Sequence, residues 1–156
     1  MATETVSKAL ELWNNDQATK AGWLLYEHIP LADRPFWAAR ILDLCRSLTQ
    51  SRPEVDAVYE IATRPADWHK GHDAFRNVRR LTIHYESAEP KNEVYGGLLY
   101  LAENVAKVTY NATSPSAPFD HDAGAWVVTC LRYLVKKVNN PECFRTVDLL
   151  YVQKPG

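Results

Sequence analysis

The sequence predicts an all-α protein, a single-domain bundle of seven or eight helices. Apolar residues recur at helical spacing along most of the chain, and helix-start signals precede these runs. Strand signals are few, and no dipeptide such as Asn-Gly separates two alternating runs. A length of 156 residues is enough for one domain with its own hydrophobic core. We therefore expect one α-helical domain over residues 1–156, frayed from about residue 153.

The first two helices are predicted from a short apolar stripe and the polar break that follows it. Val6, Leu10 and Trp13 are spaced by four and three residues, as one face of a helix requires. Asp16 ends the polar run and is the expected N-cap of a second helix, which stops near Ile29.

The next three helices are marked by capping residues and prolines. A third helix begins after Asp33, with Pro35 in its first turn, and extends to about residue 49. Ser51 and Glu54 match a capping box, which predicts a short fourth helix to about residue 62. A fifth helix opens at residues 65–67.

Residues 92–112 carry the clearest helical pattern in the chain. Two adjacent apolar stripes leave only a narrow polar strip, so we expect a central helix that packs on more than one side. The stripes are Val94, Leu98, Leu101, Val105, Val108 and Tyr95, Leu99, Ala102, Ala106, Tyr110. Gly96 and Gly97 lower helix propensity by about 1 kcal/mol each relative to Ala, which favours a close helix crossing at this point.

The last part of the chain is predicted to contain a loop and two more helices. The loop covers residues 113–119, and Asp120 is the expected cap of a helix whose apolar positions run from Ala123 to Val138. Asn140 begins a last short helix.

Composition limits the classes of function. Lys plus Arg number 18 against 19 Asp plus Glu, and this balance does not favour nucleic acid as a partner. The three cysteines are widely spaced without a CxxC motif, which is typical of a reducing cytoplasm. The N-terminus has no secretory leader, and no apolar run is long enough to cross a membrane. We therefore expect a cytoplasmic protein without a membrane segment.

The stretch DWHKGHDAFRNVRRLTIHY, residues 67–85, concentrates basic and imidazole groups. We expect one continuous helix with Ala74, Val78 and Leu81 facing the core and the charged residues facing solvent. One reading of this face is the solvated side that every amphipathic surface helix has. A second reading is a surface for a protein partner with an acidic surface, because arginine forks suit carboxylates. The predicted partner-binding residues are Trp68, His69, His72, Arg76, Arg79 and Arg80. Trp13 and Trp37, in contrast, are expected in the core.

Two His-Asp pairs give an alternative reading. A helical chain with a histidine, a His-Asp pair and a later aspartate resembles the HD phosphohydrolase family, in which such residues bind divalent metals that activate water. The resemblance covers about four residues and implies the metal ligands His28, His72, Asp73 and Asp120 or Asp122. The surrounding sequence argues against it, because the first pair lies on the face assigned to solvent and the second at a helix start.

Other catalytic patterns are missing from the sequence. No glutamate has a histidine three residues later, as di-iron bundles require, and no GxSxG motif is present. A small-ligand pocket near Tyr95, Gly97 and Tyr100 is a further alternative. The favoured hypothesis is a domain that binds another macromolecule, such as an adaptor, a regulator or a small inhibitor or immunity-type protein, without catalytic centre or cofactor; oligomeric state is left open.

Overall fold

The computed structural model describes residues 3–49, 52–116 and 118–138. Within these ranges the chain forms seven α-helices, two 3-10 helices and no strand, which confirms the all-α prediction. The elements are α1 (Thr3–Asn14), α2 (Ala18–His28), η1 (Leu31–Asp33), α3 (Arg34–Arg46), α4 (Pro53–Ala62), η2 (Pro65–Lys70), α5 (Gly71–Glu86), α6 (Glu93–Asn111) and α7 (Ala123–Val138). None of the helices in the described ranges has both the length and the apolar composition of a membrane span.

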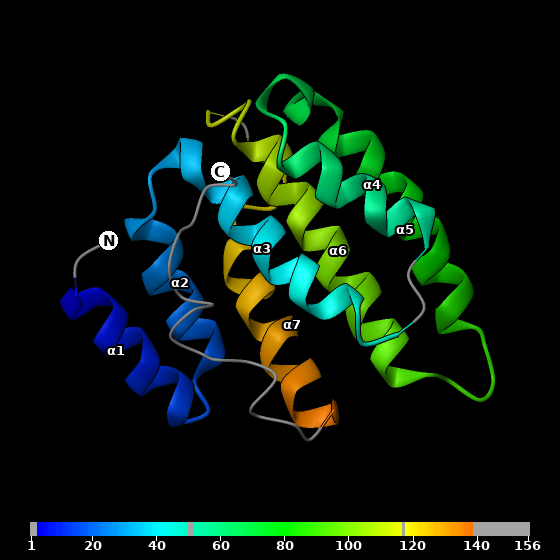
Figure 1. The fold of residues 1–156 in the computed structure, drawn as a ribbon, viewed down its shortest axis with the longest axis horizontal. Coiled ribbons are helices and arrows are strands. Elements are labelled where there is room, and N and C mark those ends of the chain that lie inside the picture. Colours follow the sequence, from blue (N-terminus) through cyan, green and yellow to red (C-terminus); the bar gives the residue numbers. More distant parts are fainter. Residues whose placement is uncertain (1–2, 50–51, 117, 139–156) are drawn as a thin grey trace.

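Helix α6 is the centre of the bundle (Figure 1), because α3, α4, α5 and α7 all pack against it. Between Leu98 and Val108, every member of the two predicted apolar stripes is buried, which confirms the expected central helix. The side chain of Asn92 caps the helix by accepting a hydrogen bond from the Tyr95 amide at 3.1 Å.

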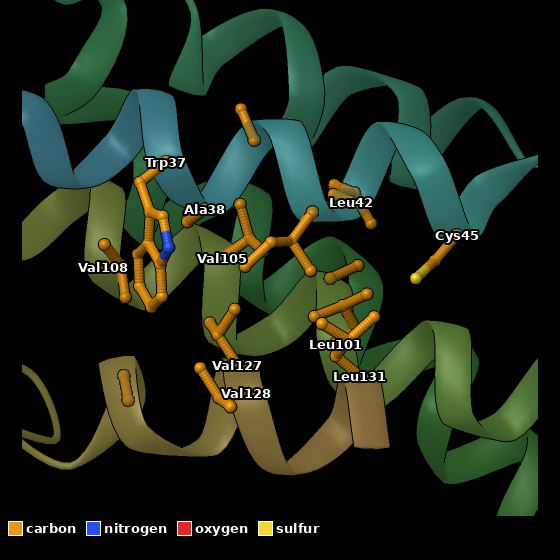
Figure 2. Close-up of a cluster of buried hydrophobic side chains, with 14 of the residues drawn as sticks. Trp37, Ala38, Leu42, Cys45, Leu101, Val105, Val108, Val127, Val128 and Leu131 are labelled. Carbon is orange, nitrogen blue, oxygen red and sulfur yellow. The ribbon is translucent and has the colours of Figure 1, made fainter. Parts of the chain in front are cut away.

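The interior is built where α3, α6 and α7 meet. Figure 2 shows Trp37 and Leu42 of α3, Val105 of α6, and Val127 and Leu131 of α7 in one cluster of buried hydrophobic side chains. All five side chains are buried, and burying each such group contributes roughly 1.5–3 kcal/mol. The core cluster includes residues from every α-helix, so α1 to α7 share one hydrophobic core. Trp13 and Trp37 both belong to it, as predicted.

Glycines permit the closest helix contacts. A methyl group at Gly96 would overlap the ring of Tyr85 from α5, and one at Gly97 would lie 2.7 Å from Leu134 of α7. The close crossing predicted from this glycine pair is therefore confirmed. At the crossing of α2 and α7, a methyl group at Gly22 would lie 2.8 Å from the backbone of Ala125.

Two predicted helix caps are wrong. Asp16 has a φ of 60°, outside the conformation of an N-cap, and Gln17 is the N-cap of α2. The Asp16 carboxylate instead accepts a hydrogen bond from Lys136 at 2.6 Å, which ties the α1–α2 turn to α7 and lowers the pKa of Asp16. Asp120 also has a φ of 60° and lies three residues before Ala123, the first residue of α7; its carboxylate accepts a hydrogen bond from the Asp122 amide, outside the helix, at 3.3 Å. Both aspartates occupy tight left-handed turns, a conformation that aspartate tolerates.

The other helix-start predictions have mixed outcomes. Asp33 is the N-cap of α3 by position, and Pro35 lies in the first turn, but the Asp33 side chain makes no capping hydrogen bond. Arg52 is the N-cap of α4, while Ser51 lies outside the described residues. The short helix predicted from Asn140 and the predicted fraying at residue 153 also lie outside them.

Candidate functional site

The stretch singled out in the sequence forms two elements, so the prediction of one continuous helix is wrong. Residues 65–70 form the 3-10 helix η2, and α5 begins at Gly71. Gly71 lies directly against α6, because an added methyl group would be 2.9 Å from the Ala106 carbonyl oxygen and the Tyr110 amide nitrogen. The junction between the 3-10 helix η2 and the α-helix α5 therefore lies directly against α6.

Trp68 is turned into the protein. It is only 8% exposed, its indole N–H donates to the Ala62 carbonyl at 2.9 Å, and its ring packs edge-on against Phe36. The burial of this indole is compensated by its hydrogen bond. Trp68 therefore holds η2 against α3 and α4 and offers little of its surface to a partner.

His72 is half-buried in a ring cluster. Its imidazole centroid lies 5.0 Å from that of Phe119 and 5.5 Å from that of Tyr110. Phe75 completes the cluster, and the Lys107 ammonium lies 5.0 Å from the Phe75 ring centroid. The ring packing at His72 thus joins the start of α5 to the loop before α7, which helical periodicity alone does not indicate.

Arg79 points toward a buried carboxylate. Glu103 of α6 is 5% exposed and accepts a hydrogen bond from the Thr82 hydroxyl at 2.6 Å. Arg79 Nη1 lies 3.5 Å from the Glu103 carboxylate and 3.8 Å from that of Glu86. The Glu86 carboxylate also accepts a hydrogen bond from Tyr100 at 2.8 Å. Arg79 is thereby part of the α5–α6 contact.

Glu103 is the residue of this network that sequence reasoning missed. Its helix contains polar residues on a narrow strip, and a single glutamate within an apolar stretch gives no sign of its burial. The available signal was Arg79 and Thr82 at i and i+3, which place a cation and a hydroxyl on one side of α5.

The remaining predicted residues, His69, Arg76 and Arg80, are exposed. His69 lies on η2, whereas Arg76 and Arg80 lie on α5. With their exposed neighbours, these two arginines form a surface that we call the outer face of α5: Asp73, Arg76, Asn77, Arg80, Ile83 and His84. Arg80 donates to Asn77 at 3.4 Å, and neither arginine of this face makes an ion pair with a carboxylate of the described residues. Ile83 is 56% exposed, more than any other large hydrophobic residue in the described part of the chain.

The metal ligands implied by the phosphohydrolase resemblance are not brought together. His28 is exposed and bonds to the Leu24 carbonyl of its own helix, and His72 lies among aromatic rings. Asp120 pairs with Lys107 at 3.0 Å, and His121 lies 3.1 Å from Asp122. Across the ranges that the structure describes, no three His, Cys, Asp or Glu side chains are arranged to hold a metal ion.

A pocket of about 430 Å³ opens between α5, α6 and α7, where the sequence suggested a ligand site near Gly97 and Tyr100. We call it the aromatic pocket; its lining residues are Tyr85, Gly97, Tyr100, Asn104, Trp126, Thr129, Cys130 and Tyr133. Tyr95 is not among them, although its ring contacts that of Tyr85. Burial is the main cause that raises the pKa of Tyr100 and of Cys130 to about 12, so both side chains are neutral at pH 7.

The chain matches no protein-family model, no curated protein and no solved structure.

Proposed function

We propose that this protein acts by binding an acidic protein partner through the outer face of α5. The observation that carries the proposal is the exposure of Ile83 beside Arg76 and Arg80, two arginines without a carboxylate partner among the described residues. Arginine is enriched at protein interfaces, and the centre of an interface is more apolar than its rim, so an exposed isoleucine among arginines suits a contact surface.

The charge distribution suits an acidic partner. The net charge of the chain is −1, so attraction has to come from a local group of cations. Arg76 and Arg80 supply planar forks that can each bind a carboxylate with two hydrogen bonds. Arg79 is not required for this contact, because its guanidinium already faces Glu103 and Glu86.

The test is a photo-crosslinking experiment with a crosslinking residue in place of Asn77, an exposed position on the outer face. In lysate of the source cells, we expect crosslinks to a small set of proteins with acidic segments. The double variant Arg76→Glu, Arg80→Glu should lose these crosslinks while keeping its melting temperature.

The matched control is Lys20→Glu, Arg52→Glu, which makes the same charge change at two exposed positions, one on α2 and one at the N-cap of α4. It should retain the crosslinks. If the Arg76→Glu, Arg80→Glu variant captures the same proteins as the wild type, the outer face of α5 is not the binding surface.

A further inference from the structure

The aromatic pocket is a second, separate feature of the molecule. Four of its eight lining residues are aromatic, and they come from three helices: Tyr85 from α5, Tyr100 from α6, and Trp126 and Tyr133 from α7. Trp126 is 43% exposed, and Tyr100 and Tyr133 are exposed as well. The volume of about 430 Å³ lies within the usual range of small-molecule sites.

The pocket depends on two adjacent glycines. At Gly96, a side chain would overlap the Tyr85 ring, and at Gly97 it would come within 3.1 Å of the Tyr133 ring. Each glycine weakens the helix by about 1 kcal/mol relative to alanine. In return, the Tyr85 ring can lie close to the α6 backbone at Gly96 and the Tyr133 ring at Gly97, which itself lines the pocket.

The chemistry of the lining indicates what charge a ligand can have. None of the eight lining residues carries a charge at neutral pH, so the lining itself contains no arginine, lysine or histidine that could pair with an anion. Close to the pocket, the Glu86 carboxylate accepts a hydrogen bond from the Tyr100 hydroxyl at 2.8 Å and lies 3.8 Å from Arg79 Nη1. A phenol that donates to a carboxylate has a more electron-rich ring, and the negative face of such a ring attracts cations.

Two of the rings already attract cations of the protein itself. The Lys137 ammonium lies 5.5 Å from the Tyr133 ring centroid, and the Lys91 ammonium lies 5.9 Å from that of Tyr85. Lys137 is also held by Glu93 at 2.6 Å, so its charge is compensated. These contacts show that the Tyr133 and Tyr85 rings each have an ammonium group within cation–π distance.

We propose that the aromatic pocket binds an organic cation, an alkylated ammonium group attached to an apolar body. The group would lie against the Trp126, Tyr100 and Tyr133 rings, beside the Tyr100 hydroxyl that donates to Glu86. Weakly hydrated cations of this type are recognised by groups of aromatic side chains. The site is independent of the outer face of α5 and of the partner proposed for it.

The experiment compares choline with 3,3-dimethylbutan-1-ol, which has the same shape without the charge, and with benzyltrimethylammonium as a larger cation. Binding is followed by tryptophan fluorescence and by NMR shifts of the pocket residues. We expect both cations to bind, with choline at least about fivefold tighter than the alcohol, as a cation–π contribution implies. Trp126→Ala should weaken cation binding by about fivefold or more, and Trp126→Phe, which keeps a ring, should weaken it less.

The control variant is Ile83→Ala, which changes an exposed residue outside the pocket and should leave cation binding unchanged. Circular dichroism melting checks that each variant is folded. Three results would overturn the proposal. The first is that no cation binds at about 10 mM, a concentration at which even weak millimolar sites fill. The others are that the uncharged alcohol binds as tightly as choline or more tightly, or that Trp126→Ala binds cations like the wild type. A concentration-dependent dimer that Trp126→Ala abolishes, without cation binding, would assign the pocket to a second copy of the chain.

Discussion

Replacing Arg79 by methionine tests whether this arginine supports the fold or belongs to an exposed surface. Its guanidinium lies 3.5 Å from the Glu103 carboxylate, where the Coulomb attraction is about 5 kcal/mol at an effective dielectric constant of 20. The Arg79 side chain is 41% exposed, so water screens much of this attraction. The substitution leaves Glu103 buried with only the hydrogen bond from Thr82. We expect the free energy of unfolding to fall by about 2 kcal/mol.

The assay is chemical denaturation with thermal melting as a second measurement. For a chain of this length, a loss of about 2 kcal/mol lowers the melting temperature by roughly 4–8 °C. Arg76→Met, one turn earlier on α5 and exposed, is the control and should change stability by less than about 0.5 kcal/mol.

A double variant separates the charge from the packing. Glu103→Gln keeps an acceptor for Thr82 and removes the unpaired charge, so adding it to Arg79→Met should recover most of the lost stability. The reasoning is refuted if Arg79→Met is no less stable than Arg76→Met, or if Glu103→Gln gives no recovery in the Arg79→Met background.

Three further predictions follow from other parts of the structure. Gly22→Ala should lower the free energy of unfolding by about 1–2 kcal/mol, because the new methyl group meets the Ala125 backbone and this outweighs the gain in helix propensity. Urea denaturation measures the change. Unchanged stability would mean that α2 and α7 can move apart to make room for the methyl group. Burial raises the thiol pKa of Cys45 and Cys130 to about 12. At pH 8, both thiols should therefore react with iodoacetamide about a thousandfold more slowly in the native than in the unfolded protein. Peptide mass spectrometry measures the rate for each cysteine, and equal rates in the two states would contradict the buried packing. Burial, together with a hydrogen bond to a carboxylate, raises the pKa of Tyr100 from 10.0 to about 12. The contribution of Tyr100 to stability should therefore be complete below pH 10 and decline as the pH approaches 12. Absorbance at 295 nm reports the ionisation of the phenol, and titration of Tyr100 near pH 10 would refute the assignment.

Much of the fold was predictable because local rules decide it. The two apolar stripes of α6 allow only a helix that is covered on several sides, and the glycine pair within it indicates a close crossing. The buried face of α5 was predictable for the same reason, since Ala74 and Val78 face the core, although the helix begins only at Gly71. These patterns depend on period and composition, which a single sequence contains.

The candidate site was less predictable because its residues depend on contacts between distant segments. A helical wheel places His72 and Arg79 on the solvent side of α5, but the wheel contains no information on α6 or on the loop before α7. Long polar side chains at the edge of an apolar face can turn toward a neighbouring helix, as Arg79 does toward Glu103. The aromatic pocket was predicted only at Gly97 and Tyr100, because Trp126 and Tyr133 come from a different helix.

The contact between α2 and α7 has a consequence for the order of events in folding. Thr19 and Thr129 share a hydrogen bond at 2.8 Å, and Lys136 reaches Asp16, across sequence separations of 110 and 120 residues. Beyond its pairing with α1, helix α2 packs mainly against α7. During synthesis, the apolar side of the hairpin formed by α1 and α2 therefore stays exposed until α7 has been made. Closing a loop over this sequence distance is slow. Truncation before residue 123 would remove α7 and leave the apolar side of the hairpin exposed to solvent.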